Sequence, residues 1–275
     1  MDFLLELLKA ALLGVVQGIT EWLPVSSTGH MILLDEFLPM NVSAEFMEMF
    51  RVVIQLGSIL AVLVLYFGRL SPVLTKKSPA EKRACLSLWG KILIAVIPAG
   101  VVGVLLDDWL DAHLYNYITV AVTLIVYGAA FLFIEKIQAG KSPRFAEADD
   151  IDHKTALKIG CFQMLSLIPG TSRSGSTILG GMLSGVSRPA GAEFSFFLAL
   201  PVMLGASTLK LMKFGFTFTG AELAILATGT IVAFVVSLVA IRFLVAFVRR
   251  HSFAVFGWYR IALGILVILA NLAFR

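Results

Sequence analysis

Two short polar stretches interrupt apolar sequence in this chain, and both carry residue types that handle protons or phosphate. The first runs from Gln17 to His30 (QGITEWLPVSSTGH) and the second from Phe162 to Thr177 (FQMLSLIPGTSRSGST). Each contains a proline followed by small hydroxyl residues and a glycine. Ionisable groups within membrane-embedded sequence are costly and mark functional sites by default. The chemistry is therefore expected in these two loops.

The second loop has the composition of an anion cradle. Arg173 lies among glycines and hydroxyl residues, just before an apolar helix predicted to begin near Thr177. Backbone N–H groups at a helix N-terminus favour an anion, and an arginine can hold two phosphate oxygens at once. The alternative is a Ser/Gly-rich helix break whose arginine pairs with a structural carboxylate. The candidate phosphate-binding residues are Gly170, Thr171, Ser172, Arg173, Ser174 and Thr177.

The first loop combines an acid, a base and hydroxyl nucleophiles. Gln17 and Glu21 are four residues apart, so both face one side of a helix. Ser27 and His30 follow the proline turn, and His30 could take a proton from Ser27 or from water while Glu21 orients the imidazole or binds a metal ion. The alternative is that Glu21 is a helix-end acid and His30 an interfacial histidine. Further candidate substrate-binding hydroxyls in this loop are those of Ser26 and Thr28.

The composition is that of a polytopic membrane protein. Of 275 residues, 59% are hydrophobic and 15% charged, whereas a soluble domain has about 25% charged residues. The net charge of +4 is better explained by membrane topology than by nucleic-acid binding, and we expect no nucleic-acid partner. The two cysteines are far apart, which indicates neither a disulfide framework nor a zinc site.

The elements that position the loops are predicted as all-α: six transmembrane helices plus two re-entrant helix–loop–helix hairpins. The hairpins are expected at 3–34 and 155–184, because a proline loop divides each segment into halves too short to span the bilayer. The six spans are predicted at 46–68, 90–106, 118–135, 193–212, 221–247 and 254–274.

The two halves of the sequence resemble each other beyond the loops. The tripeptide Ala-Glu-Phe opens both the first and the fourth predicted span, at 44–46 and 192–194, and follows the two loops in the same order. Three predicted crossings separate the hairpins, so the halves 1–137 and 150–275 should be inverted within one membrane domain of residues 1–275. This arrangement places a site near the bilayer midplane, between the loops.

Basic residues set the expected orientation. They concentrate in the predicted loop 69–89, in the polar linker 136–155 that joins the halves, and at Arg249 and Arg250, whereas the predicted loops 35–45 and 107–117 contain no Lys or Arg. The basic loops should be cytoplasmic, so the first hairpin should enter from outside. The basic residues of the first of these loops are Arg69, Lys76, Lys77, Lys82 and Arg83.

The motifs resemble those of one enzyme family. QGITEWLPVSSTGH resembles the (E/Q)xxxE and PVSSTGH motifs of bacterial undecaprenyl-diphosphate phosphatases of the bacitracin-resistance (BacA) type, and PGTSRSGST resembles that family's PGxSRSGxT motif. The resemblance extends from about residue 10 to beyond residue 260. It implies the fold described above and hydrolysis of undecaprenyl diphosphate to undecaprenyl phosphate and inorganic phosphate, which recycles the lipid carrier for peptidoglycan synthesis.

The resemblance also implies roles and a location. Glu21, Ser27, His30 and Arg173 become the catalytic candidates, with Glu21 the candidate ligand for a divalent cation (Mg²⁺ or Ca²⁺). Gln17 occupies a motif position that can hold Glu, which puts in doubt any mechanism that needs a carboxylate pair there. The expected location is the bacterial plasma membrane, with a site open to the outer side. Whether the chain forms a homodimer is left open.

A polyprenyl-phosphate transporter or flippase is the alternative function. Inverted repeats with broken segments are typical of transporters, and hydrophobic periodicity does not separate the two functions. Phosphate release by purified protein in detergent discriminates between them, because transport alone predicts none.

Overall fold

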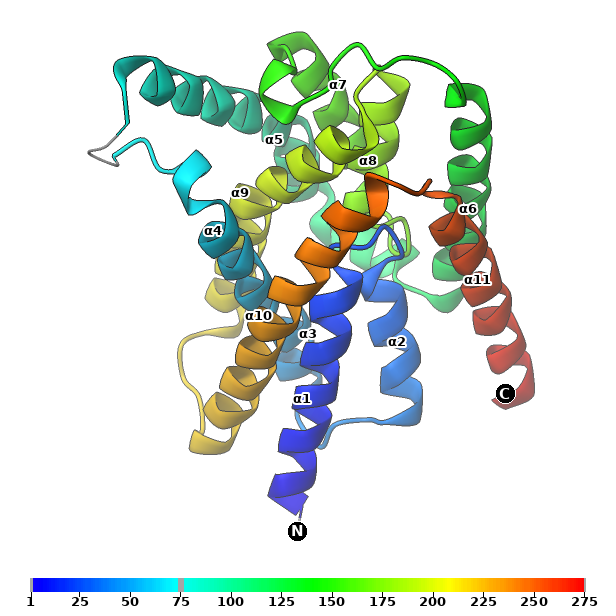
Figure 1. The fold of residues 1–275 in the computed structure, drawn as a ribbon. Helices are drawn as coiled ribbons and strands as arrows, with labels where there is room; N and C mark the ends of the chain where they lie inside the picture. Colours follow the sequence, from blue (N-terminus) through cyan, green and yellow to red (C-terminus); the bar gives the residue numbers. More distant parts are fainter. Residues whose placement is uncertain (1, 74–76, 275) are drawn as a thin grey trace.

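The structure is a computed structural model that describes residues 2–73 and 77–274 (Figure 1). Lys76 of the predicted basic loop therefore lies outside the described residues. Within the described ranges the regular structure is helical, and the β-type pairing is a single isolated bridge between Phe145 and Val186. The helices are α1 Asp2–Thr20, α2 Ser27–Phe37, α3 Ala44–Val53, α4 Gln55–Leu70, α5 Pro79–Leu114, α6 Tyr117–Gln138, η1 Ala148–Asp150, α7 His153–Gln163, η2 Met164–Leu167, α8 Arg173–Leu183, α9 Arg188–Phe214, α10 Gly220–Val248 and α11 Ala254–Phe274.

Seven helical segments are long and apolar enough to cross a membrane, so the chain is an integral membrane protein. Six of them correspond to the predicted spans, with α3 and α4 together forming the first. The seventh is Phe3–Thr20 of α1, which was expected to be too short. That expectation was wrong for α1, because its helix continues unbroken for 19 residues, up to the start of the loop. The opposing arm α2 has 11 residues, as do α7 and α8.

Helix ends differ most from prediction in α5, which has 36 residues. Ser78 and Glu81 form a reciprocal capping box, and Pro79 occupies the first turn, so the helix begins well before the apolar span. The helix then continues to Leu114, through the predicted outer loop. Apolar composition predicts only the part of a helix that lies in lipid. The position at which the helix begins is set by its capping residues.

Close helix packing brings the two loops together. In α1, a Cβ added to Gly14 would lie 2.6 Å from the carbonyl oxygen of Gly229 in α10. In α7, a Cβ added to Gly160 would lie 2.2 Å from the carbonyl oxygen of Ala95 in α5. Helices α1 and α7 thus each pack tightly on a long helix from the other half of the chain. Figure 1 shows α1 beside α10 and α6 beside α11, with the polar loops meeting between these pairs.

Candidate active site

The helices after the two loops, α2 and α8, begin with the same local geometry. Ser26 (φ 72°) and Ser172 (φ 76°) are the two non-glycine residues with positive φ in the described part of the chain. Each caps its helix: the Gly29 N–H donates to Ser26 Oγ (3.2 Å), and the Gly175 N–H donates to Ser172 Oγ (3.1 Å). Such backbone strain costs about 1–3 kcal/mol and concentrates at functional sites. Two similar sequence motifs therefore build two similar helix N-termini.

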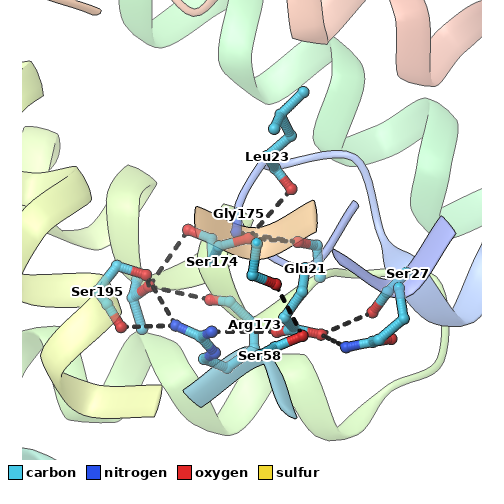
Figure 2. A network of polar contacts seen from close by, with 12 residues as sticks. Glu21, Leu23, Ser27, Ser58, Arg173, Ser174, Gly175 and Ser195 are labelled. Atoms are coloured by element: carbon cyan, nitrogen blue, oxygen red, sulfur yellow. Dashed lines mark hydrogen bonds and ion pairs between the residues drawn. The ribbon is translucent and has the colours of Figure 1, made fainter. Parts of the chain in front are cut away.

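The first residues of α2 and α8 meet at one carboxylate. Ser27 Oγ donates to Glu21 Oε2 (2.9 Å), while the guanidinium of Arg173 donates to Glu21 Oε1 (3.0 Å). The Gln17 amide also donates to Glu21 Oε2 (3.0 Å). Figure 2 shows Ser27 and Arg173 approaching Glu21 from opposite sides. The structure thus brings together four predicted site residues from two distant loops.

Arg173 is held on its other side by α9. One terminal nitrogen donates to the backbone oxygen of Ser195 (2.6 Å) and to its hydroxyl (3.0 Å), and Thr177 Oγ1 donates to that same hydroxyl (2.8 Å). The Arg173 and Glu21 side chains are only 9% and 5% exposed. The Nε–H of Arg173 has no acceptor among the described residues. The arginine is therefore buried and oriented, and its Nε is left without a partner among the described residues.

His30 lies differently from expectation. Its Nδ1 is 2.7 Å from the Ser26 carbonyl oxygen, and its Nε2 is 2.6 Å from the Tyr259 hydroxyl. A carbonyl only accepts, so Nδ1 carries the proton and Nε2 accepts from Tyr259. The structure shows no hydrogen bond from His30 to Ser27 or Glu21 among the residues described. The acceptor for the Ser27 proton is Glu21 instead.

Arg260 of α11 is a site residue that the sequence reasoning missed. It is completely buried and donates to the carbonyl oxygens of Pro24 (3.1 Å), Gly170 (2.9 Å) and Thr171 (2.9 Å). One guanidinium thus fastens the two loops to each other through their backbones. The available signal was an arginine within the predicted span 254–274, where a charge is costly. Ser195, a polar residue in the fourth predicted span, was missed in the same way.

The remaining predicted substrate-binding residues have mixed environments. Ser174 Oγ donates to the Leu23 carbonyl (3.3 Å) and lies 3.1 Å from Ser172 Oγ, so it joins the two loops. Thr171 is buried, with its hydroxyl unpartnered among the residues described. Gly170 has φ 86°, and an added Cβ would lie 2.2 Å from Thr123 Oγ1, so glycine is required there. Thr28 is half-buried on α2.

A metal ion would find few protein ligands at this site. Residues 2–73 and 77–274 contain no group of three or more His, Cys, Asp or Glu side chains placed to hold one. Glu21 is the carboxylate of the cluster, and both its oxygens already accept hydrogen bonds. The donor set suits a cation held by one carboxylate and by substrate oxygens, as is common for Mg²⁺, rather than a cage built by the protein.

Comparison with known proteins agrees with the motifs. The family profile described as bacitracin resistance protein BacA matches residues 10–266. A protein named undecaprenyl-diphosphatase from Desulfitobacterium hafniense is 56% identical over 267 residues, covering 97% of this chain and 96% of its own length. A protein of the same name from Acetivibrio thermocellus is 57% identical over 272 residues, covering 99% of this chain and 100% of its own length. Another from Enterococcus faecalis is 55% identical over 266 residues, covering 96% of each chain. The chain therefore belongs to the bacitracin resistance protein BacA family.

Proposed function

We propose that this membrane protein hydrolyses undecaprenyl diphosphate to undecaprenyl phosphate and inorganic phosphate, and thereby supports peptidoglycan synthesis and bacitracin resistance. The observation that carries the proposal is the convergence of two helix N-termini, at Ser27 and Arg173, on the Glu21 carboxylate. This arrangement supplies a nucleophile, a proton acceptor and a cation within one buried cluster. Relatives at 54–57% identity that carry the name undecaprenyl-diphosphatase support the same reaction.

The terminal phosphate binds at the N-terminus of α8. The dipole and the first backbone N–H groups of the helix favour an anion there. The Nε–H of Arg173 supplies a charged donor that no group in the described part of the chain uses, while Ser195 and Glu21 fix the plane of the guanidinium. Charge neutralisation and positioning are the main requirements of phosphoryl transfer. The polyprenyl tail extends among apolar helices.

In the first step Ser27 Oγ attacks the terminal phosphorus and its proton passes to Glu21 Oε2, 2.9 Å away. The bond between the terminal phosphorus and the bridging oxygen breaks, and undecaprenyl phosphate leaves with the electron pair. The Gln17 amide, 3.0 Å from the same Glu21 oxygen, orients the carboxylate. Direct attack by water, with Glu21 as base, is the second candidate route because the same carboxylate serves it.

In the second step water attacks the phosphoserine, and inorganic phosphate leaves as Glu21 returns its proton to Ser27. We assign His30 as the acceptor of the water proton, because its bond to Ser26 leaves Nε2 unprotonated. A divalent cation held by Glu21 and substrate oxygens would neutralise phosphate charge. Tyr259, which donates to Nε2, would have to release that nitrogen first.

We also propose the finer architecture and its orientation. The matched N-termini of α2 and α8, and the crosswise packing of α1 on α10 and α7 on α5, support an inverted repeat of halves 1–137 and 150–275 with a re-entrant hairpin in each. Three of the four arms, α2, α7 and α8, have 11 residues and extend about 16 Å, too short for a core of about 30 Å, whereas α1 has 19 residues. The protein then lies in the bacterial plasma membrane with its site open outward.

Membrane-impermeant thiol labelling tests the orientation. Cysteines at Lys141 and Thr217, in a background lacking Cys85 and Cys161, should react from the cytoplasmic and outer side respectively. Labelling of both from one side would overturn the orientation.

Phosphate release from polyprenyl diphosphate by purified protein in detergent tests the function. Wild type should release phosphate, and Glu21→Ala should lose this activity while retaining its thermal unfolding transition. Both proteins are assayed with and without a chelator, which reports the cation requirement. A folded wild-type protein that moves polyprenyl phosphate across vesicles but releases no phosphate would favour the transporter alternative.

A further inference from the structure

A cavity lies away from the active site, between α4 and α10. Its volume is about 710 Å³, and it is lined by aliphatic side chains of both helices together with Tyr66, Arg242, Arg249 and Arg250. We call it the α4–α10 cavity. It lies toward the ends of both helices, α4 ending at Leu70 and α10 at Val248, next to the basic loops.

The two helices contact each other closely before they reach this cavity. A Cβ added to Gly57 would lie 2.1 Å from the Thr230 carbonyl oxygen, and the Ser237 hydroxyl donates to Ser58 Oγ (3.0 Å). Figure 2 shows Ser58 beside the Glu21 network. Tyr66 follows Ser58 by about 12 Å along α4, at 1.5 Å per residue. The cavity is therefore a separate site from the catalytic one.

The arginines of the cavity have no carboxylate partner among the described residues. Arg242, Arg249 and Arg250 are exposed, and within the described chain they make no side-chain hydrogen bond or ion pair. The neighbouring Arg69, by contrast, pairs with Asp149 (3.0 Å) and Glu193 (2.5 Å). The cavity arginines thus remain unpaired in the described ranges although carboxylates that pair with Arg69 lie nearby.

Arg242 is the most informative of the three. It lies six residues before the end of α10, about 9 Å inside an apolar helix that is long enough to span the membrane. An arginine at such a depth is costly unless it reaches the interface or meets an anion. Arg249 lies two helical turns later on the same face of α10, so the two guanidiniums can converge at the cavity mouth.

We propose that the α4–α10 cavity binds the phosphate headgroup of an anionic phospholipid from the surrounding bilayer. The guanidiniums supply charge-assisted donors to the phosphate, and the aliphatic walls contact the acyl chains. Basic pockets between transmembrane helices on the cytoplasmic side bind anionic headgroups in this way. A free phosphate ion would use the cations but gain nothing from the apolar walls, so a lipid fits the cavity better.

Native mass spectrometry of the purified chain, titrated with phosphatidylglycerol in neutral detergent, tests the proposal. The double variant Arg242→Gln/Arg249→Gln should bind phosphatidylglycerol about tenfold more weakly, because two charge-assisted contacts are lost. The matched control is Lys82→Gln/Arg83→Gln, which removes two positive charges from α5 in the same basic region. The control should change affinity by less than about twofold. Phosphatidylcholine, with no net charge, should bind wild type about tenfold more weakly than phosphatidylglycerol.

Three outcomes would overturn the proposal: equal binding of phosphatidylcholine and phosphatidylglycerol, equal loss in both double variants, or displacement of the lipid by millimolar inorganic phosphate. The variant Arg242→Lys/Arg249→Lys, which keeps both charges, should recover most of the affinity and so separates charge from damage to the fold. If the glutamine double variant does not fold, the two single glutamine variants are titrated, and unchanged binding in both would also overturn the proposal. The readout is lipid binding, so it is independent of the phosphatase reaction.

Discussion

Replacing Arg173 by lysine keeps the positive charge at the site but removes the fork geometry of the guanidinium. In the structure, one terminal nitrogen of Arg173 donates to Ser195 and the other to Glu21, while Nε–H has no acceptor among the described residues and is the donor that we assign to the substrate phosphate. A lysine has one nitrogen on a flexible stem and cannot make these contacts together. Arg173→Lys therefore tests whether orientation, beyond charge, supports catalysis.

The size of the effect follows from what is lost and what is kept. Losing one preorganised donor to a developing oxyanion lowers kcat by about 10²–10³-fold, and this is the expected effect of Arg173→Lys. Arg173→Ala also removes the charge, which in phosphoryl transfer is worth about 10³–10⁵ in kcat. It also leaves Glu21, 5% exposed, without its cation, which costs about 3–5 kcal/mol of stability.

Phosphate release in detergent, with kcat and KM measured separately, is the assay. The matched control is Arg188→Lys, because Arg188 forms an analogous pair with Glu135 through its Nε (2.8 Å and 3.1 Å). Arg188 precedes Ser195 by seven residues along α9, about 10 Å from the site. The control should change kcat by less than about threefold. Retention of near wild-type kcat in Arg173→Lys, or an equal loss in the control, would refute the reasoning.

Three further variants address other parts of the site. Ser27→Ala should lower kcat by about 10³-fold or more and abolish a trapped phosphoenzyme. The control variant Ser166→Ala should do neither. An active Ser27→Ala enzyme would leave only the water route. Arg260→Lys should lower the thermal unfolding temperature by about 5–10 °C, because one ammonium cannot serve three buried carbonyls; an unchanged melting curve would contradict its fastening role. Gln17→Glu replaces an amide donor, 3.0 Å from the Glu21 carboxylate, by a second negative charge. Because two neighbouring carboxylates depend more on a cation, activity should become more sensitive to a chelator than in wild type. Identical sensitivity would argue against cation binding at Glu21.

Much of the site could be predicted from sequence because its chemistry lies in two continuous motifs. The pairing of Gln17 with Glu21 follows from helical spacing, and the helix-opening position of Arg173 follows from the Ser/Gly-rich break. The hydrogen-bond partners of His30, which are Ser26 and Tyr259 rather than Ser27, could not be predicted in this way. Which side chains meet after a proline turn depends on φ at Ser26, and that residue adopts a strained positive value.

The amino-acid sequence by itself determined the membrane class, the six predicted spans, the two broken segments and the family. Hydropathy, proline and glycine positions, and short motifs are local properties, so they can be read without a fold. The tertiary structure alone decided that Ser27 and Arg173 share Glu21, that Arg260 fastens the two loops, and that Ser195 orients the arginine. These contacts join residues far apart in the chain. They form because glycines at helix crossings let α1 and α7 approach their partner helices closely enough to bring both loops to one place.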